Sequence, residues 1–286
     1  MSSSLSIETA SKVTPKQWIK RVAGQAVSYA YPQKTKHLLG RPTGSPSGLI
    51  DKLLMAHLKE RAKRLGHVEF FENLHRDFWQ GDGGAVFAKN CDHRFEDLFL
   101  SKQKEDFDAL QALWNSVGGI DRIVEFGCNS GLVLNYLTQN LDGVKSATGI
   151  EINQNQVDAN QASEGFDSRV KFECADGGDW LFKSGKPSTL FVTNGGVLEY
   201  FRRERLNEML TLISKRLEPA LVFSIEPVAS DHDWSKTKES IPFGEELSFS
   251  HNYTDLFESN GFEIVHQRAT EFESWKMMAT VAKAIG

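Results

Sequence analysis

An acidic residue stands two positions before a glycine loop in the segment VEFGCNSGLVL, which covers residues 124–134. An apolar run precedes the loop and another follows it, which predicts a strand, a tight turn and a helix. Gly127 allows a sharp turn, and Gly131 lets the next helix begin close to a bound group. The first turn of that helix offers free N–H donors. The segment fits an ordinary strand-to-helix turn, and it also fits a loop that holds a nucleotide-like cofactor.

Polar residues follow the next three predicted strands in the same way. Glu151 ends the second apolar run, twenty residues after Gly131, where an acid accepts hydrogen bonds from ribose hydroxyls. Asp176 and Gly177 follow the third strand, where a carboxylate and a backbone amide would meet an adenine ring. Asn194 and two glycines follow the fourth strand. Ligands of open α/β sheets bind beyond the carboxyl ends of the strands, so together these residues indicate a nucleotide-like site.

Candidate proton acceptors lie after the fourth and fifth predicted strands. They are Glu199, Glu226, His232 in the DHD loop, and His251 before the last helix. Neutral imidazole accepts a proton near neutral pH, so the two histidines are the preferred candidates for a general base. Each candidate also has a structural interpretation. Glu199 fits a carboxylate at a helix start, the DHD loop fits exposed acidic chain, and His251 fits a neighbour of a helix cap.

Alternating strands and helices from Ile120 onwards must position these residues. The predicted parallel strands are RIVEF, SATGIEI, VKFECA, STLFVTN and ALVFSIEPV. Helical stretches separate them, which predicts helices on both faces of the sheet. The segment FSHNYTDLFESNG is predicted to be helical, and the strands EIVHQRA and WKMMATVAKA follow it with only a short link between them. A short link joins antiparallel strands, so the predicted α/β fold is a mostly parallel seven-stranded sheet with a C-terminal antiparallel hairpin.

The N-terminal part has a different character. We expect a mobile tail over residues 1–12, a mainly helical cap over 13–101 and the main domain over 102–286. The segment 31–48 is rich in Pro and Gly, which predicts loop or extended chain there. The cap is expected to give the acceptor site its specificity or to pack at the junction with the main domain.

Helices within this part are predicted from caps and periodicity. They are expected from Thr14 to Tyr29, from residue 47 or 48 to Leu65, and over 102–117, with two short helices around a glycine turn over 66–100. The helix that ends at Leu65 has an apolar stripe, which a second copy of the chain or the chain itself could cover. A homodimer is therefore one predicted arrangement.

The composition describes an ordinary soluble protein. The chain has 286 residues, 40% hydrophobic residues and a formal net charge of −5, so no overall basic field marks nucleic acid as the main partner. The three cysteines form no CxxC pair, which fits a reducing compartment and gives no zinc signal. The polar N-terminus lacks the apolar core of a signal peptide, and no apolar stretch is long enough to span a bilayer. A cytoplasmic protein without a membrane partner is predicted.

From about Ile120 to the C-terminus the chain resembles class I methyltransferases that use S-adenosylmethionine. The resemblance rests on EFGCNSG, which contains an acid, one residue, and glycine-x-x-x-glycine. Many members have a further glycine where this chain has Asn129, and asparagine also adopts positive φ. The resemblance implies that Glu125 orders the methionine amino group. It also implies that Gly127, Asn129 and Gly131 line the methionine and ribose side.

The other strand ends extend this resemblance. It implies that Glu151 holds the ribose hydroxyls, with Ile152 next to it in the cofactor-binding set. It also implies that Asp176 holds the adenine amino group with Gly177 beside the ring, and that Asn194 lies near the methionine moiety. The implied cofactor is S-adenosylmethionine, with S-adenosylhomocysteine as its product.

The preferred function is methyl transfer to a small molecule. O-methylation of a sugar, phenol or natural-product hydroxyl is favoured, and N-methylation is the alternative. A nicotinamide-dependent oxidoreductase fits less well, because the middle glycine of GxGxxG is missing and an acid before the loop suits an ammonium better than a diphosphate. A catalytically silent cofactor-binding module is the third hypothesis. The DHD loop and Glu226 could ligate a metal, but Asn194 stands where metal-dependent relatives have an acid, so no metal is expected.

Overall fold

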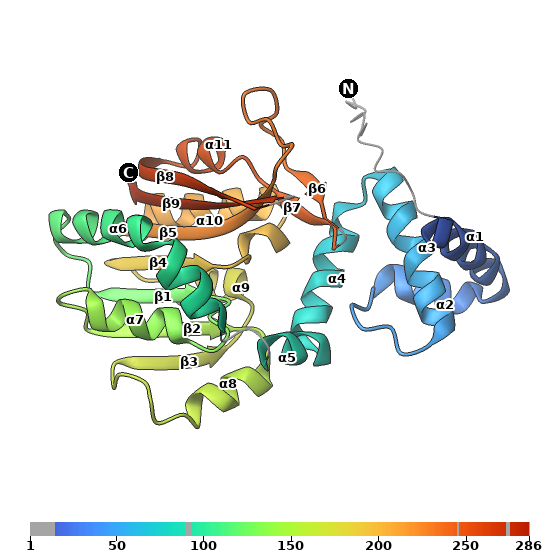
Figure 1. Cartoon of the computed structure of the whole chain (residues 1–286), viewed down its shortest axis with the longest axis horizontal. Coiled ribbons are helices and arrows are strands. Elements are labelled where there is room, and N and C mark those ends of the chain that lie inside the picture. Colours follow the sequence, from blue (N-terminus) through green and yellow to red (C-terminus); the bar gives the residue numbers. More distant parts are fainter. Residues whose placement is uncertain (1–14, 90–92, 245, 273–274, 286) are drawn as a thin grey trace. The chain divides into compact units, whose positions relative to one another are not determined.

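The computed structural model describes residues 15–89, 93–244, 246–272 and 275–285 (Figure 1). The chain divides into two compact units, residues 1–83 and residues 84–286. The predicted mobile tail, residues 1–12, lies outside the described residues. The specificity role expected for residues 13–101 stays a prediction.

The first unit is helical. Its helices are α1 (Pro15–Ala30), α2 (Pro32–Gly40), α3 (Leu49–Leu65) and α4 (Val68–Gln80), and α5 (Asp82–Lys89) begins at its end. The loop predicted over 31–48 is wrong in its first part, where α2 forms. Pro32 occupies the first turn of α2, where a missing N–H costs no hydrogen bond, and the helix ends at the next glycine. The predicted glycine turn is shorter than expected, because two of its glycines lie inside α5.

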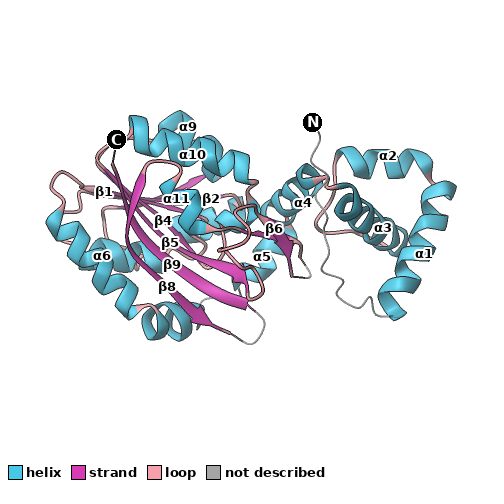
Figure 2. Ribbon diagram, turned by 90° about the horizontal axis from the view of Figure 1, so that it is seen from above, coloured by secondary structure: helices cyan, strands magenta, loops and turns pink. Residues whose placement is uncertain are grey.

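The second unit contains the predicted sheet (Figure 2). Its seven strands lie in the order β3-β2-β1-β4-β5-β9-β8. The strands are β1 (Arg122–Phe126), β2 (Ser146–Glu151), β3 (Val170–Cys174), β4 (Thr189–Asn194), β5 (Ala220–Ala229), β8 (Phe262–Glu271) and β9 (Trp275–Ala284). The first five strands are parallel, and β9 runs antiparallel to both β5 and β8. The structure therefore confirms the predicted sheet and its hairpin. The strand order reverses between β1 and β4, which is where open α/β sheets bind their ligands.

Helices cover both faces of this sheet. The helices of one face are α6 (Lys104–Ser116), α7 (Leu132–Asn140) and α8 (Gln154–Gln161). Those of the other face are α9 (Gly177–Ser184), α10 (Arg203–Arg216) and α11 (Tyr253–Glu258). A short π-helix, η1 (Phe95–Leu100), packs on α7 through the rings of Phe99 and Tyr136, whose centroids are 5.7 Å apart. Two buried hydrophobic clusters result, one on each side of the sheet.

A small second sheet precedes α11. Its strands β6 (Ile241–Phe243) and β7 (Ser248–Ser250) are antiparallel. The helix predicted to begin at Phe249 is wrong in its first turn, because this residue is buried in β7. The helix begins only at Tyr253, after Asn252 has accepted the Asp255 N–H over 3.1 Å as its cap. Within the described parts of the chain, no helix has the length and apolar character needed to cross a bilayer.

Candidate active site

The loop between β1 and α7 is left-handed at three positions. The φ angles are 62° at Gly127, 44° at Asn129 and 73° at Gly131. A Cβ atom at Gly127 would lie 2.6 Å from Cγ2 of Val197, and one at Gly131 would lie 2.6 Å from the Phe172 ring. Both glycines are therefore required by φ and by their neighbours. Asn129 can replace a glycine here because asparagine tolerates this conformation.

Glu151 fixes this loop to the end of β2. One carboxylate oxygen accepts the Asn129 N–H over 3.0 Å, and the other accepts the Asn153 N–H over 3.0 Å. The side-chain amide of Asn160 in α8 donates to the Asn129 carbonyl over 2.7 Å. Burial raises the pKa of Glu151, against the backbone amides of Asn153, Asn129 and Ile152, which lower it. The predicted residues Asn129, Glu151 and Ile152 thus lie together.

Glu125 is a buried acid beside the same loop. Its side chain is 2% exposed, and its Oε2 has no hydrogen-bond partner among the described residues. Burial raises its pKa well above the ordinary value, and the nearby Glu151 raises it further, whereas the Leu134 backbone lowers it. A buried acceptor without a donor is unfavourable, so a ligand with an ammonium group would stabilise this site.

The third strand end also lies close to β1. Asp176 is the N-cap of α9, where its Oδ1 accepts the Asp179 N–H over 3.0 Å. A Cβ atom at Gly177 would lie 3.0 Å from the ring of Phe126, the last residue of β1. The carboxylate of Asp176 therefore has a structural partner at the start of α9.

The loop after β4 connects the glycine loop to a pair of buried acids. Gly195 and Gly196 follow Asn194 with φ angles of 83° and 101°. The Val197 side chain packs on Gly127, and the Val197 N–H donates to Glu226 Oε2 over 2.9 Å. The predicted Asn194 stands at the start of this connection.

Glu199 and Glu226 form the acid pair. Glu199 is 7% exposed in the short 3₁₀ helix Leu198–Tyr200, and Glu226 is 0% exposed in β5. Burial raises the pKa of Glu199 to about 8 and that of Glu226 to about 7. The charge of Glu226 raises the pKa of Glu199 further, and Ser248 lowers it. Two acids with raised pKa values at a strand end are typical of proton-transfer sites.

Sequence reasoning missed Tyr253 and Val197. Tyr253 is 0% exposed, and its hydroxyl has no hydrogen-bond partner among the described residues. Burial raises the pKa of Tyr253 well above its ordinary value, and the charges of Glu226 and Glu199 raise it further, so the hydroxyl lies near the acid pair. No local signal marks either residue, because Val197 acts through its backbone and Tyr253 depends on β7 for its position.

His251 has partners on both ring nitrogens. Nε2 lies 3.2 Å from the Leu198 carbonyl, and Nδ1 lies 2.6 Å from Ser240 Oγ. A carbonyl only accepts, so Nε2 carries the proton and Nδ1 accepts from the serine hydroxyl. Burial lowers the pKa of His251 to about 3. The imidazole is neutral and has no spare lone pair in this arrangement.

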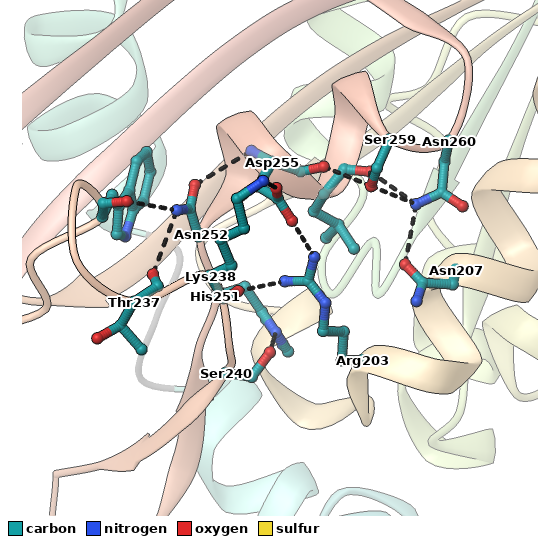
Figure 3. Close-up of polar contacts among 12 residues, drawn as sticks. Arg203, Asn207, Thr237, Lys238, Ser240, His251, Asn252, Asp255, Ser259 and Asn260 are labelled. Atoms are coloured by element: carbon teal, nitrogen blue, oxygen red, sulfur yellow. Dashed lines mark hydrogen bonds and ion pairs between the residues drawn. The ribbon is translucent and has the colours of Figure 1, made fainter.

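His232 lies in the segment between β5 and β6. Its Nδ1 is 2.9 Å from Ser250 Oγ, and burial lowers its pKa. Figure 3 shows how this segment is held against α10 and α11. Arg203 forms an ion pair with Asp255, and the Asn252 side chain donates to the Thr237 carbonyl over 3.3 Å. The structure brings His251 near the acid pair through Leu198, whereas no described contact joins His232 to either glutamate.

The residues present fit S-adenosylmethionine. Glu125 offers a free buried oxygen to an ammonium group, and the oxygens of Glu151 keep lone pairs for ribose hydroxyls. The glycine loop permits close approach to the backbone. Among the described residues, no group of three or more His, Cys, Asp or Glu side chains is arranged to hold a metal ion.

Comparisons with known proteins identify the fold and one domain. Residues 123–220 match a family model described as a methyltransferase domain. No curated protein matches the sequence. Among solved structures, the magnesium protoporphyrin IX methyltransferase ChlM from Synechocystis PCC 6803 with bound S-adenosylmethionine has a TM-score of 0.51 at 15% identity, over 75% of this chain and 97% of that chain.

A second solved structure gives the same result. A SAM-dependent methyltransferase from Leishmania major has a TM-score of 0.51 at 14% identity, over 76% of this chain and 82% of that chain. At such identities the solved structures establish the fold, and the family model adds the domain type. Residues 123–220 thus resemble a methyltransferase domain, and the chain shares the fold of these S-adenosylmethionine-dependent methyltransferases.

Proposed function

We propose that this protein transfers the methyl group of S-adenosylmethionine to a hydroxyl group of a small molecule. The observation that carries the proposal is the junction at Val197, which links the left-handed loop at Gly127 to the buried acid Glu226. This contact would place the proposed cofactor site next to the proposed proton-accepting site. Both are needed when the acceptor is an alcohol or phenol.

The cofactor would be held by residues on both sides of the glycine loop. Glu125 would bind its ammonium group, Glu151 its ribose and Asp176 its adenine. Asn194 would bind the methionine part. When bound, the cofactor supplies a methyl group on a sulfonium, which is open to in-line attack. The loop amides and the two buried acids would orient this group and exclude water from it.

Glu199 is the general base that the contacts support best. Its Oε1 lies against the loop after β4, since a Cβ atom at Gly196 would be 2.3 Å from it. Ionised Glu199 would accept the acceptor proton, and Glu226 and Tyr253 would stabilise the proton on the pair. His251 has less support because both its nitrogens are engaged. His232 is the second candidate.

N-methylation is the alternative, and the acid pair gives it a specific basis. Two ionised carboxylates would attract a cationic amine, and a neutral amine needs no base for attack. The specificity role of residues 13–101, the cytoplasmic location and the homodimer remain predictions.

Titration calorimetry tests the cofactor part. Wild-type protein and Glu151→Ala are titrated with S-adenosylmethionine, S-adenosylhomocysteine and NADH. We expect the first two ligands to bind wild-type protein with micromolar affinity. Their affinity for the variant should be at least tenfold lower, because two backbone N–H groups and the ribose lose their acceptor. Glu263→Ala, on β8, is the control and should bind as wild type. Binding of NADH alone would overturn the proposal in favour of an oxidoreductase.

Acceptor screening tests the second part. Release of S-adenosylhomocysteine is measured with panels of matched phenols, sugars and amines. Turnover with hydroxyl acceptors that disappears in Glu199→Gln, while cofactor affinity persists, supports O-methylation. Turnover restricted to amines contradicts it. Cofactor binding without turnover on any panel would favour the silent binding module.

A further inference from the structure

One face of α1 is apolar and exposed. Trp18, Ile19, Val22 and Tyr29 are 58%, 61%, 46% and 77% exposed. At 3.6 residues per turn these four side chains and Ala26 fall within about 100° of the helix circumference. We call these five residues the α1 apolar face. Helices of globular proteins normally turn such a face towards the core, so its outward direction needs an explanation.

The opposite side of α1 is fixed on α3. A Cβ atom at Gly24 would lie 2.2 Å from the Leu53 carbonyl oxygen and 2.8 Å from His57 Cβ, so only glycine allows this crossing. Arg21 reaches Glu60 over 3.3 Å. A rotation that turned the α1 apolar face towards α3 would place large side chains at the position of Gly24. The outward direction of the face is therefore built into the packing.

Further apolar side chains are exposed on α2 and α3 and at the N-cap of α2. Tyr31, Leu39, Leu49 and Ile50 are all at least 37% exposed. Among the described residues, nine of the fourteen exposed large hydrophobic side chains lie before residue 84, in less than a third of the chain. The exposure spreads over three helices and does not follow one narrow stripe. Such a spread is unlike the single narrow stripe of a helix that docks in a groove of a partner protein.

The charge of the first unit indicates what kind of partner would cover the α1 apolar face. Residues 1–83 contain 13 Lys and Arg against 7 Asp and Glu, whereas residues 84–286 contain 20 against 31. Two copies paired face to face through their α1 apolar faces would bring two basic units together, which like-charge repulsion disfavours. An anionic occupant is favoured. Trp and Tyr beside basic side chains are typical of helices that lie in the headgroup region of a bilayer.

We propose that the α1 apolar face docks on the surface of an anionic lipid bilayer, with Lys20, Lys36 and Arg41 next to the headgroups. All three are exposed. The sequence predicts no membrane partner because it has no spanning segment, but a helix that lies in the surface needs none. This proposal is independent of the methyl acceptor.

Vesicle sedimentation of the full chain tests it. The vesicles are phosphatidylcholine alone or phosphatidylcholine mixed with phosphatidylglycerol, at low and high salt. Each basic side chain near an anionic surface increases the binding affinity about fivefold. Binding should therefore be at least tenfold stronger on the mixed vesicles than on phosphatidylcholine alone, and it should weaken at high salt. Val22→Ser and Trp18→Ser should each reduce it roughly tenfold.

Val265→Ser is the matched control, because Val265 on β8 has the same exposed fraction as Val22, 46%. It should bind vesicles as wild type. Far-UV circular dichroism checks that each variant keeps its helices. Absence of vesicle binding would overturn the proposal, as would binding that Val22→Ser leaves unchanged. A wild-type dimer in sedimentation velocity that Val22→Ser converts to monomer would assign the face to a second copy instead.

Discussion

Val197 donates its backbone N–H to the buried carboxylate of Glu226 over 2.9 Å. The same residue packs its side chain on Gly127 in the loop after β1. One residue thus joins the glycine loop to Glu226, whose pKa burial raises to about 7. A change in the shape of the loop will therefore reach the acid pair.

Gly127→Ala should damage cofactor binding more than it damages the fold. Positive φ costs an alanine about 1–2 kcal/mol, and the new methyl group would also displace Val197. Gly143→Ala is the matched control, since Gly143 has a φ of 76° and nothing within 4 Å of an added Cβ. Both variants should lose stability to urea, and Gly127→Ala should lose more because its methyl group also displaces Val197. Only Gly127→Ala should lose cofactor affinity in calorimetry, and equal loss in both would contradict the role of the contact.

Glu125→Gln should weaken the cofactor without destabilising the protein. Glu125 is buried with an unpartnered oxygen, so a neutral side chain of the same shape removes an unfavourable group from the apo fold. Loss of the carboxylate opposite an ammonium should lower affinity by about 1.5–3 kcal/mol, or roughly 10–150-fold. Calorimetry and thermal unfolding are measured together. A lower melting temperature with unchanged affinity would mean that Glu125 is a structural residue.

The sequence predicted the sheet well because its signals are local. The run RIVEF corresponds to β1 and LVLNYLTQN to α7, and each lies between residues that end an element. Glu125 lies in the first of the apolar strand runs and Glu151 ends the second, SATGIE, so the same pattern predicts that both acids stand at strand ends. The same reasoning failed at α2, where a proline that reads as a breaker instead begins a helix.

The sequence named Glu199 and Glu226 among the candidate proton acceptors, but it could not predict that they form a buried pair. Glu199 and Glu226 are distant in sequence, and their pKa values depend on burial that β7 and α11 complete. Phe249 and Ser250 look like part of a helix until they pair with β6. Preference for histidine as the base followed from its ordinary pKa, whereas burial lowers the pKa of His251 to about 3. The pKa of a buried side chain thus depends on the tertiary structure around it and not on its residue type alone.

Asp106→Ala should strongly destabilise the second unit. Asp106 is 0% exposed in α6 and accepts hydrogen bonds from His266 Nε2 over 2.8 Å and Arg268 Nε over 3.0 Å, which tie α6 to β8. Removal of one partner from a buried charge pair costs about 3–5 kcal/mol. Asp108→Ala is the control, because its ion pair with Lys104 is exposed to solvent and contributes little to stability. Urea denaturation distinguishes them, and similar midpoints would contradict the prediction.

Glu199→Gln should stabilise the protein increasingly as pH rises. The pKa of Glu199 is about 8 in the folded protein, against 4.5 for a free glutamate side chain, so the folded state keeps a proton that the unfolded state releases. This makes the wild type lose stability between pH 4.5 and pH 8. The variant has no such loss, and its advantage should grow by about 2–4 kcal/mol from about pH 5 to about pH 8. Urea denaturation at both pH values measures it. Glu204→Gln, at an exposed site, should show no such trend.

The pH dependence of turnover should separate a carboxylate base from a histidine base. If Glu199 accepts the proton of a hydroxyl acceptor, kcat/KM rises with pH until about 8, where the folded acid is half ionised. Glu199→Gln should then lower kcat about 10²–10⁴-fold, with cofactor affinity unchanged.

His232→Gln is the parallel variant, since burial lowers the pKa of His232 and a base with that pKa would already be active below pH 6.5. A rise that ends below pH 6.5 and disappears in His232→Gln would transfer the role of base to the histidine. A flat profile with full activity in both variants would mean that the acceptor is an amine that attacks in its neutral form.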